Sequence, residues 1–309
     1  MSSLGTTFPL VSRRRLIGLA WGAMHGARRG AGSDVAGSRP YTAWDDPDRI
    51  DWATSARLSS ARNSDEFVVR DYFADESPRV VLVTDRGRSM TTTPSWVPWL
   101  CKEVAVESAA ELIEESVSEA RGLMGFLEFA DDPGSGVRWC PPGSNRRGQA
   151  LVDEAAPDAT IGDDRSGVAA AFSFLALHRR AVPSASFVFV LSDFLDPPPL
   201  ATWEWALDRG WDVVPVVIQD PVWEQSFPDV DGIVIPLLGP SGERRLVRLR
   251  RGESARYRER NAERRRSLLE GLWSLGIGSV LVSESDLGHV LDAFLAWSTE
   301  RQAFWGAAA

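Results

Sequence analysis

Short apolar runs rich in β-branched residues alternate with segments of helical periodicity from residue 80 onward. The runs predict strands over residues 80–84, 124–130, 187–192, 211–219 and 279–284. Several of them are apolar on both faces, which is typical of parallel strands buried between helices. The alternation predicts a doubly wound α/β fold of the three-layer Rossmann type, in which helices cover both faces of a mostly parallel sheet.

The segments between these runs repeat apolar residues at helical spacing. They predict helices over residues 100–121, 168–180, 200–207, 268–275 and 287–295. An arginine-rich segment at residues 256–266 also has a helical pattern. Its interleaved glutamates indicate a solvated, salt-bridged face.

Two parts of the chain depart from the simple alternation. Residues 233–250 predict two strands joined by a Gly-Pro-Ser-Gly turn, and we expect this antiparallel hairpin to be added to the main sheet. Residues 1–78 have little periodicity but contain many aromatic side chains, which need somewhere to pack. We therefore expect an N-terminal wrap packed on the core, followed by one domain over residues 79–309.

Composition and charge narrow the functional class. The chain has 309 residues, a net charge of -9 and a pI near 5.0, which argues against a nucleic-acid partner. Lys102 is the only lysine and follows Cys101, whereas the lysine of a P-loop follows glycine, so a P-loop is excluded. No apolar run approaches the roughly 20 residues that span a bilayer. We expect a cytoplasmic protein without a membrane span.

Two acidic residues mark the ends of predicted strands. Asp85 follows the strand at residues 80–84, and Asp193 follows the strand at residues 187–192. In a doubly wound sheet, ligands bind at the carboxyl ends of strands, where two connections part to opposite faces. If these strands are neighbours, both carboxylates converge near the hydroxyl groups of Ser89 and Ser192. Such oxygen atoms are the ligands that Mg²⁺ prefers.

Several motifs resemble one protein family. TDRGRSM around Asp85 resembles the Asp-x-Ser-x-Ser metal-adhesion motif of von Willebrand factor A domains, and LSDF around Asp193 resembles the later Ser-Asp element of that fold. DDPDRIDWATSAR, GWDVVPVVIQDP and RYRER occur in the order seen in one branch of that fold. The chain is similar to this uncharacterised bacterial MxaS-like family, which is commonly encoded beside MoxR-type AAA+ ATPases.

The resemblance implies a metal-adhesion site with one altered position. It assigns ligand positions to Asp85, Ser89, Ser166 and Asp193. Gly87 stands where the family has its first serine, and Arg86 and Arg88 flank it. Three interpretations follow: a degenerate Mg²⁺ site, a metal-free adhesion surface in which Arg86 or Arg88 replaces the cation, or residues that only cap turns and helices.

Two tryptophans follow this motif directly. Trp96 and Trp99 either anchor a protein partner together with Arg86 and Arg88, or pack inward at the start of the next helix. The three histidines of the chain have no spacing typical of a zinc site.

The sequence contains no recognisable pair of nucleophile and base, so a non-enzymatic interaction module is expected. The resemblance implies an adaptor that works with a MoxR-type ATPase in the assembly, activation or metal loading of a client complex, such as methanol dehydrogenase during maturation. The alternative is a metal-dependent phosphatase or hydrolase that uses Asp85 and Asp193. A third interpretation is a structural scaffold whose crevice binds nothing.

Overall fold

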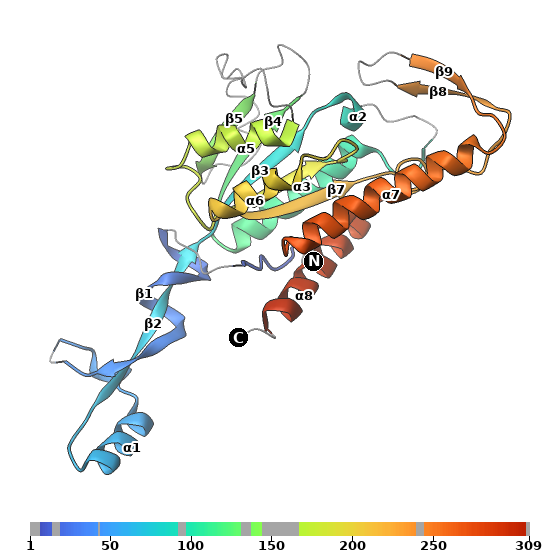
Figure 1. Cartoon of the computed structure of the whole chain (residues 1–309). Helices are drawn as coiled ribbons and strands as arrows, with labels where there is room; N and C mark the ends of the chain where they lie inside the picture. Colours follow the sequence, from blue (N-terminus) through green and yellow to red (C-terminus); the bar gives the residue numbers. More distant parts are fainter. Residues whose placement is uncertain are drawn as a thin grey trace, which may run out of the picture.

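A central six-stranded sheet organises the molecule (Figure 1). The computed structural model describes residues 7–13, 19–42, 44–91, 97–130, 137–143, 167–238 and 244–306. The strand order is β10-β7-β6-β3-β4-β5. The strands are β3 (Arg79–Asp85), β4 (Leu123–Phe129), β5 (Arg138–Gly143), β6 (Phe187–Ser192), β7 (Asp212–Ile218) and β10 (Val280–Val282).

The five strands predicted from the sequence are all present and pair in parallel. The fold is therefore a mixed α/β fold with a mostly parallel sheet, as the alternation predicts. The sixth strand, β5, pairs antiparallel with β4 at one edge and was not predicted. It contains Pro141 and Pro142, which lack the backbone donor that an inner strand needs.

Helices cover both faces of the sheet (Figure 1). They are α3 (Lys102–Glu119), α5 (Gly167–Leu177), α6 (Leu200–Asp208), α7 (Glu253–Ser274) and α8 (Leu287–Gly306). On one face α3 and α8 pack on Phe187 and Phe189 of β6. On the other face α5, α6 and the end of α7 pack on Val188 and Val190. The alternation along β6 thus divides the core into two layers, as expected for a buried parallel strand.

The segments predicted at residues 256–266 and 268–275 form one continuous helix, α7. Its apolar residues Leu268 and Leu272 reach the core, whereas the preceding arginine-rich turns extend beyond the sheet (Figure 1). One helix therefore contains both the solvated arginine-rich segment and the segment whose apolar residues are buried.

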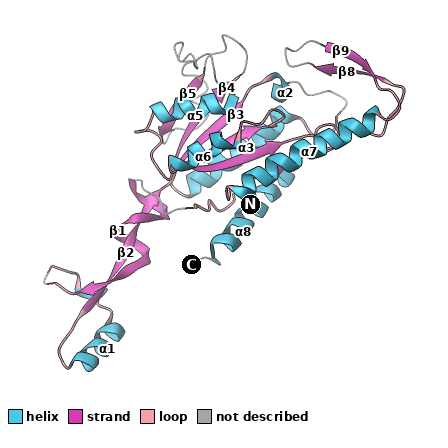
Figure 2. Cartoon of the chain, in the orientation of Figure 1, coloured by secondary structure: helices cyan, strands magenta, loops and turns pink. Residues whose placement is uncertain are grey.

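The N-terminal region differs from the expected wrap. Residues 7–13 do lie on the core: Phe8 is 3% exposed, and its ring is stacked on that of Phe294 at 4.5 Å. Instead of following the core, the next segment forms a two-stranded antiparallel arm of β1 (Leu19–Pro40) and β2 (Val68–Ser77). The arm projects away from the sheet and carries η1 (Pro47–Arg49) and α1 (Trp52–Arg62) at its far end (Figures 1 and 2).

The arm buries apolar residues locally. Val69 is 1% exposed and forms a bridge with Ile50, and the ring of Trp52 meets that of Phe67 edge-on at 6.0 Å. Trp52 and Phe67 nevertheless remain 64% and 46% exposed, and Trp44 is 97% exposed, so these aromatic side chains lie on the surface of the arm and not in the core on which they were expected to pack.

The predicted hairpin is present, but it does not join the main sheet. β8 (Val234–Leu238) and β9 (Arg244–Arg248) form a separate two-stranded sheet. Ile235 and Leu249 pack with Phe227 in a small cluster of their own, against Tyr257 of α7. This local cluster replaces the expected pairing with a strand of the main sheet.

We predict that Gly125→Ala destabilises the edge of the sheet. A Cβ atom on Gly125 of β4 would lie 2.6 Å from the backbone nitrogen of Pro142 and 2.8 Å from the carbonyl oxygen of Cys140. The backbone of β5 must then shift, at a cost of about 1–3 kcal/mol in the free energy of unfolding. Gly143→Ala is the control, because its Cβ would meet nothing closer than 3.8 Å. Urea unfolding of both variants measures the difference, and equal stabilities would contradict the prediction.

Candidate functional site

The candidate site lies at the carboxyl ends of β3 and β6, which are adjacent parallel strands. β3 continues through α2 (Arg88–Thr91) and α3, on one face, into β4. β6 continues through α6, on the opposite face, into β7. The two connections part here, so this is the switch point at which ligands bind in doubly wound sheets.

Asp85 connects the ends of the two strands. Its Oδ2 accepts a hydrogen bond of 2.6 Å from Oγ of Ser192, the last residue of β6, although the two residues are 107 positions apart. Its Oδ1 accepts a hydrogen bond of 2.7 Å from the backbone nitrogen of Gly87. Both oxygen atoms of the carboxylate thus hold backbone or strand-end groups in place.

The turn after β6 is tight and strained. Phe194 has a φ of 47°, in the left-handed region that non-glycine residues rarely adopt. Its backbone nitrogen donates to Ser192 Oγ at 3.1 Å, and its buried ring packs against that of Trp203. This turn fixes Asp193, whose Oδ1 accepts a hydrogen bond of 3.1 Å from the backbone nitrogen of Leu195.

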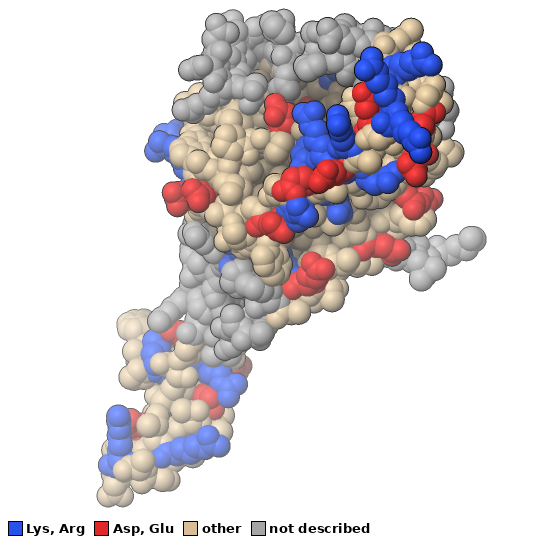
Figure 3. Space-filling view, turned by 45° about the vertical axis from the view of Figure 1, so that its right-hand side comes forward, with Lys and Arg blue, Asp and Glu red and all other residues tan. Residues whose placement is uncertain are grey.

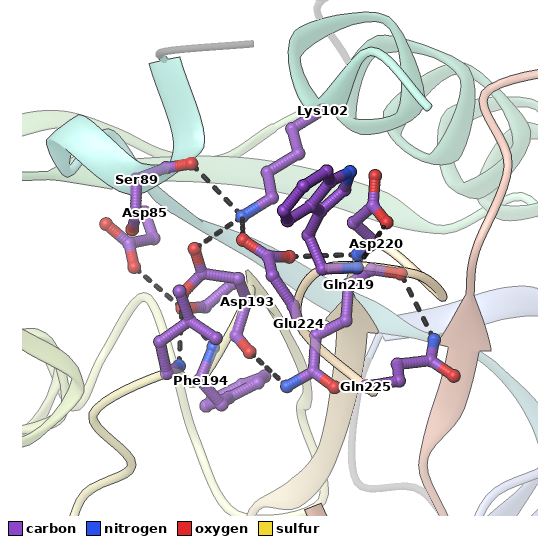
Figure 4. Close-up of polar contacts among 12 residues, drawn as sticks. Asp85, Ser89, Lys102, Asp193, Phe194, Gln219, Asp220, Glu224 and Gln225 are labelled. Carbon is purple, nitrogen blue, oxygen red and sulfur yellow. Dashed lines mark hydrogen bonds and ion pairs between the residues drawn. The ribbon is translucent and has the colours of Figure 1, made fainter. Parts of the chain in front are cut away.

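Lys102 lies at the centre of the site (Figure 4). Its ammonium group donates to Asp193 Oδ2 at 2.8 Å, to Glu224 Oε1 at 2.5 Å and to the carbonyl oxygen of Ser89 at 3.1 Å. The side chains of Lys102 and Asp193 are only 7% and 4% exposed, and that of Glu224 is 18% exposed. This is a buried ion cluster.

Glu224 is held in the loop that follows β7. Its Oε2 accepts a hydrogen bond of 2.9 Å from the backbone nitrogen of Asp220. From α7, Arg264 donates to the carbonyl oxygen of Glu224 at 2.8 Å, and Asn261 donates to that of Trp223 at 3.0 Å. The long helix therefore positions the second acid of the cluster.

The electrostatic environment favours a charged Lys102. Burial alone lowers its pKa, but the carboxylates of Asp193 and Glu224 outweigh burial, so the pKa lies above its ordinary value of 10.5. Burial raises the pKa of Glu224, and the ammonium of Lys102 offsets only part of this effect. Burial likewise lowers the pKa of Arg264, against the attraction of Glu224 and Asp193.

The structure brings some of the sequence-predicted site residues together and separates others. Asp85 and Asp193 lie on adjacent strand ends, whereas Ser89 is exposed and its carbonyl oxygen is the atom that contacts Lys102. Arg86 forms an ion pair of 2.8 Å with Glu128 of β4. Arg88 is exposed on α2.

The two predicted tryptophan anchors have different outcomes. Trp99 packs against the core, and its Nε1 donates to Asp220 Oδ2 at 3.1 Å, so it follows the inward-packing interpretation. Trp96 lies outside the described residues, and so does the predicted metal ligand Ser166.

Sequence reasoning missed Lys102 and Glu224 as site residues. The signals were present but indirect: Lys102 is the only lysine, and Glu224 follows the end of a third parallel strand.

The cluster does not fit a divalent cation. Mg²⁺ requires about six oxygen ligands near 2.1 Å. Here the ammonium of Lys102 already contacts the carboxylates of Asp193 and Glu224. Within the described part of the chain, no group of three or more His, Cys, Asp or Glu residues is arranged to hold a metal ion.

We predict that Lys102→Met destabilises the protein by about 3–5 kcal/mol, because it leaves two buried carboxylates without their cation. The control is Lys102→Met combined with Asp193→Asn and Glu224→Gln, which removes the uncompensated charges and should recover much of the loss. Chemical unfolding at neutral pH measures all forms. An equally unstable triple variant would show that the loss comes from packing and not from charge.

Wild type and Lys102→Met together also test the pKa of Lys102. A pKa raised in the folded state stabilises the protein at pH values below the ordinary 10.5, and this stabilisation is lost as the pH rises through the folded-state pKa. The difference in unfolding free energy between wild type and Lys102→Met should therefore stay constant from neutral pH to about 10.5 and shrink above it. A difference that grows above this pH would contradict the assignment.

Comparisons with known proteins place the site within a family. Residues 37–267 match the family described as "Protein of unknown function DUF58", and this range contains Asp85, Lys102, Asp193 and Glu224. No curated protein matches the chain. No helix in the described ranges has the length and apolar character of a membrane span.

Three solved structures show distant similarity. The conserved hypothetical protein BatB from Bacteroides thetaiotaomicron is 15% identical, with 73% of this chain and 99% of that chain covered and a TM-score of 0.38. An aerotolerance-related membrane protein from Bacteroides fragilis is 14% identical, with 73% and 99% covered and a TM-score of 0.38. An uncharacterised membrane spanning protein from Vibrio fischeri is 12% identical, with 72% and 98% covered and a TM-score of 0.21. The family match spans well over half of the sequence: the chain belongs to the DUF58 family of proteins of unknown function.

Proposed function

We propose that this chain is a non-enzymatic adaptor of the von Willebrand factor A-like, MxaS-like type. It binds other proteins at the carboxyl edge of its sheet and works with a MoxR-type AAA+ ATPase in the assembly, activation or metal loading of a client complex. The observation that carries the proposal is the convergence of Asp85 and Asp193 at the switch point between β3 and β6. This is where a doubly wound sheet presents its ligand site.

The character of the site favours binding over catalysis. Asp85 uses both carboxylate oxygens as acceptors for Gly87 and Ser192, and Asp193 is tied to Lys102. Hydrogen bonds to both oxygens stabilise the carboxylate charge and make Asp85 a weaker nucleophile. A metal-dependent phosphatase that uses these two acids is for this reason the weaker alternative.

The ATPase partner is inferred from the family resemblance. The motifs around Asp85 and Asp193 resemble those of MoxR-associated proteins, and membership of DUF58 agrees with such an association. A partnership with an ATPase would supply the nucleotide chemistry for which this chain lacks a P-loop lysine. We place this activity in the cytoplasm, where ATP is available.

The surface charge is suited to a protein partner. Basic and acidic side chains are interspersed on the face seen in Figure 3 and do not form a field of one sign. In α7, for example, Arg266 pairs with Glu263. A nucleic-acid partner would favour a continuous basic patch.

We predict that Arg86→Glu weakens binding of the MoxR-type ATPase of the same organism about tenfold, because Arg86 borders the site. Arg138→Glu is a matched control. Both arginines pair with Glu128, at 2.8 and 3.0 Å, and both are about equally exposed, but Arg138 belongs to β5 at the sheet edge. Binding of purified proteins is measured by interferometry, and the proposal fails if wild type binds no ATPase or if the two variants bind equally.

A phosphatase assay of wild type and Asp85→Asn tests the enzymatic alternative. Purified wild type with Mg²⁺ and generic phosphoesters should show no turnover above that of Asp85→Asn. Turnover that depends on Asp85 would replace the adaptor proposal with the phosphatase.

A further inference from the structure

We infer that the ammonium group of Lys102 is a built-in cation that takes the place of a divalent metal ion at the carboxyl edge of the sheet. A side chain of the protein, and not a bound ion, thus supplies the positive charge at this site. This inference concerns the state of the site and does not depend on the adaptor proposal.

The geometry matches the capacity of one ammonium group. A lysine ammonium has three N–H donors. Among the described residues, three acceptors lie within 3.1 Å of Lys102 Nζ: one from α2, one from the turn after β6 and one from the loop after β7 (Figure 4). Segments far apart in the chain therefore converge on one cation, as ligands converge on a metal ion.

The position of Lys102 in its helix supports a role in the cluster. Lys102 is the first residue of α3, where a positive charge opposes the helix dipole. The neighbouring backbone is fixed from both sides: Cys101 donates to Ser285 Oγ at 3.3 Å, and its carbonyl oxygen accepts from Ala105 at 2.9 Å. The lysine is thus held in an unfavourable helix position and directed toward the acids.

The chain itself supplies cations for the two carboxylates that contact Lys102, whereas the nearby Asp85 and Asp220 accept hydrogen bonds from neutral donors. Asp193 and Glu224 contribute two negative charges when ionised, and Lys102 contributes one positive charge. The guanidinium of Arg264, which hydrogen-bonds the carbonyl oxygen of Glu224 and is attracted by both carboxylates, contributes a second. A divalent ion added to this arrangement would meet two resident cations at close range.

A built-in cation has a consequence for recognition. A metal ion can bind a partner's carboxylate at an open coordination position. The three acceptors around Lys102 match its three N–H donors, so a partner's carboxylate cannot bind there in the way it binds a metal. A partner must instead contact the exposed groups around the crevice, such as Ser89 and Arg88.

Because the chain has one lysine, the native protein can report on this site directly. Labelling with ¹⁵N-lysine gives a single Nζ resonance. We expect an NH₃⁺ signal that is observable at neutral pH, is unmoved by millimolar Mg²⁺ and survives stoichiometric Mn²⁺. Loss of the signal on addition of Mn²⁺, reversed by excess Mg²⁺, would overturn the inference.

A variant provides the reverse test. Lys102→Ser removes the built-in cation and should create a Mn²⁺ site at least about tenfold tighter than any in wild type. Lys102→Ser combined with Asp193→Asn should not gain this site. Titration calorimetry measures the affinities, and a variant that folds only when Mn²⁺ is present would also support the inference. A folded Lys102→Ser protein that binds Mn²⁺ no better than wild type would overturn it.

If Lys102→Ser does not fold under either condition, the ¹⁵N experiment on the native protein decides alone. Neither result depends on the ATPase: wild type that fails to bind the ATPase but keeps its Nζ signal in Mn²⁺ would reject the adaptor and retain the built-in cation.

Discussion

One buried ion cluster connects parts of the molecule that the sheet alone does not join. Lys102 belongs to the helix after β3, Asp193 to the turn after β6 and Glu224 to the loop after β7. Since each charge is removed from water, each needs the others to offset its desolvation. Through Arg264 the cluster also reaches α7. The positions of these charged side chains therefore depend on a single ammonium group.

Much of the sheet could be predicted because its signals are local. The strand at residues 187–192 was predicted with its observed limits, since six consecutive buried residues leave a clear apolar run. The pairing of Asp85 with the end of β6 followed from the rule that parallel strands end at one edge. The predictions that were wrong concern contacts between segments that are far apart in the sequence. A turn sequence predicts the hairpin β8–β9 but not whether it joins the main sheet. Aromatic content suggested burial, but Trp52 and Phe67 contact each other in the arm and remain exposed.

The centre of the site could not be read from residue patterns for a similar reason. Lys102 in the first turn of a helix and Glu224 in a loop are ordinary surface positions in a linear sequence, and only the fold brings them together. One clue was chemical. Of the 34 basic residues, one is lysine, and its ammonium is a compact point charge with three donors.

The two borders of the sheet limit how another chain can attach. At one border β5 carries Pro141 and Pro142, which cannot donate to an incoming backbone, and at the other β10 has only three residues. Neither border is a good template for β-augmentation by an extended peptide. A partner that binds the main sheet must therefore recognise it through side chains, so specificity there rests on surface chemistry that single substitutions can change.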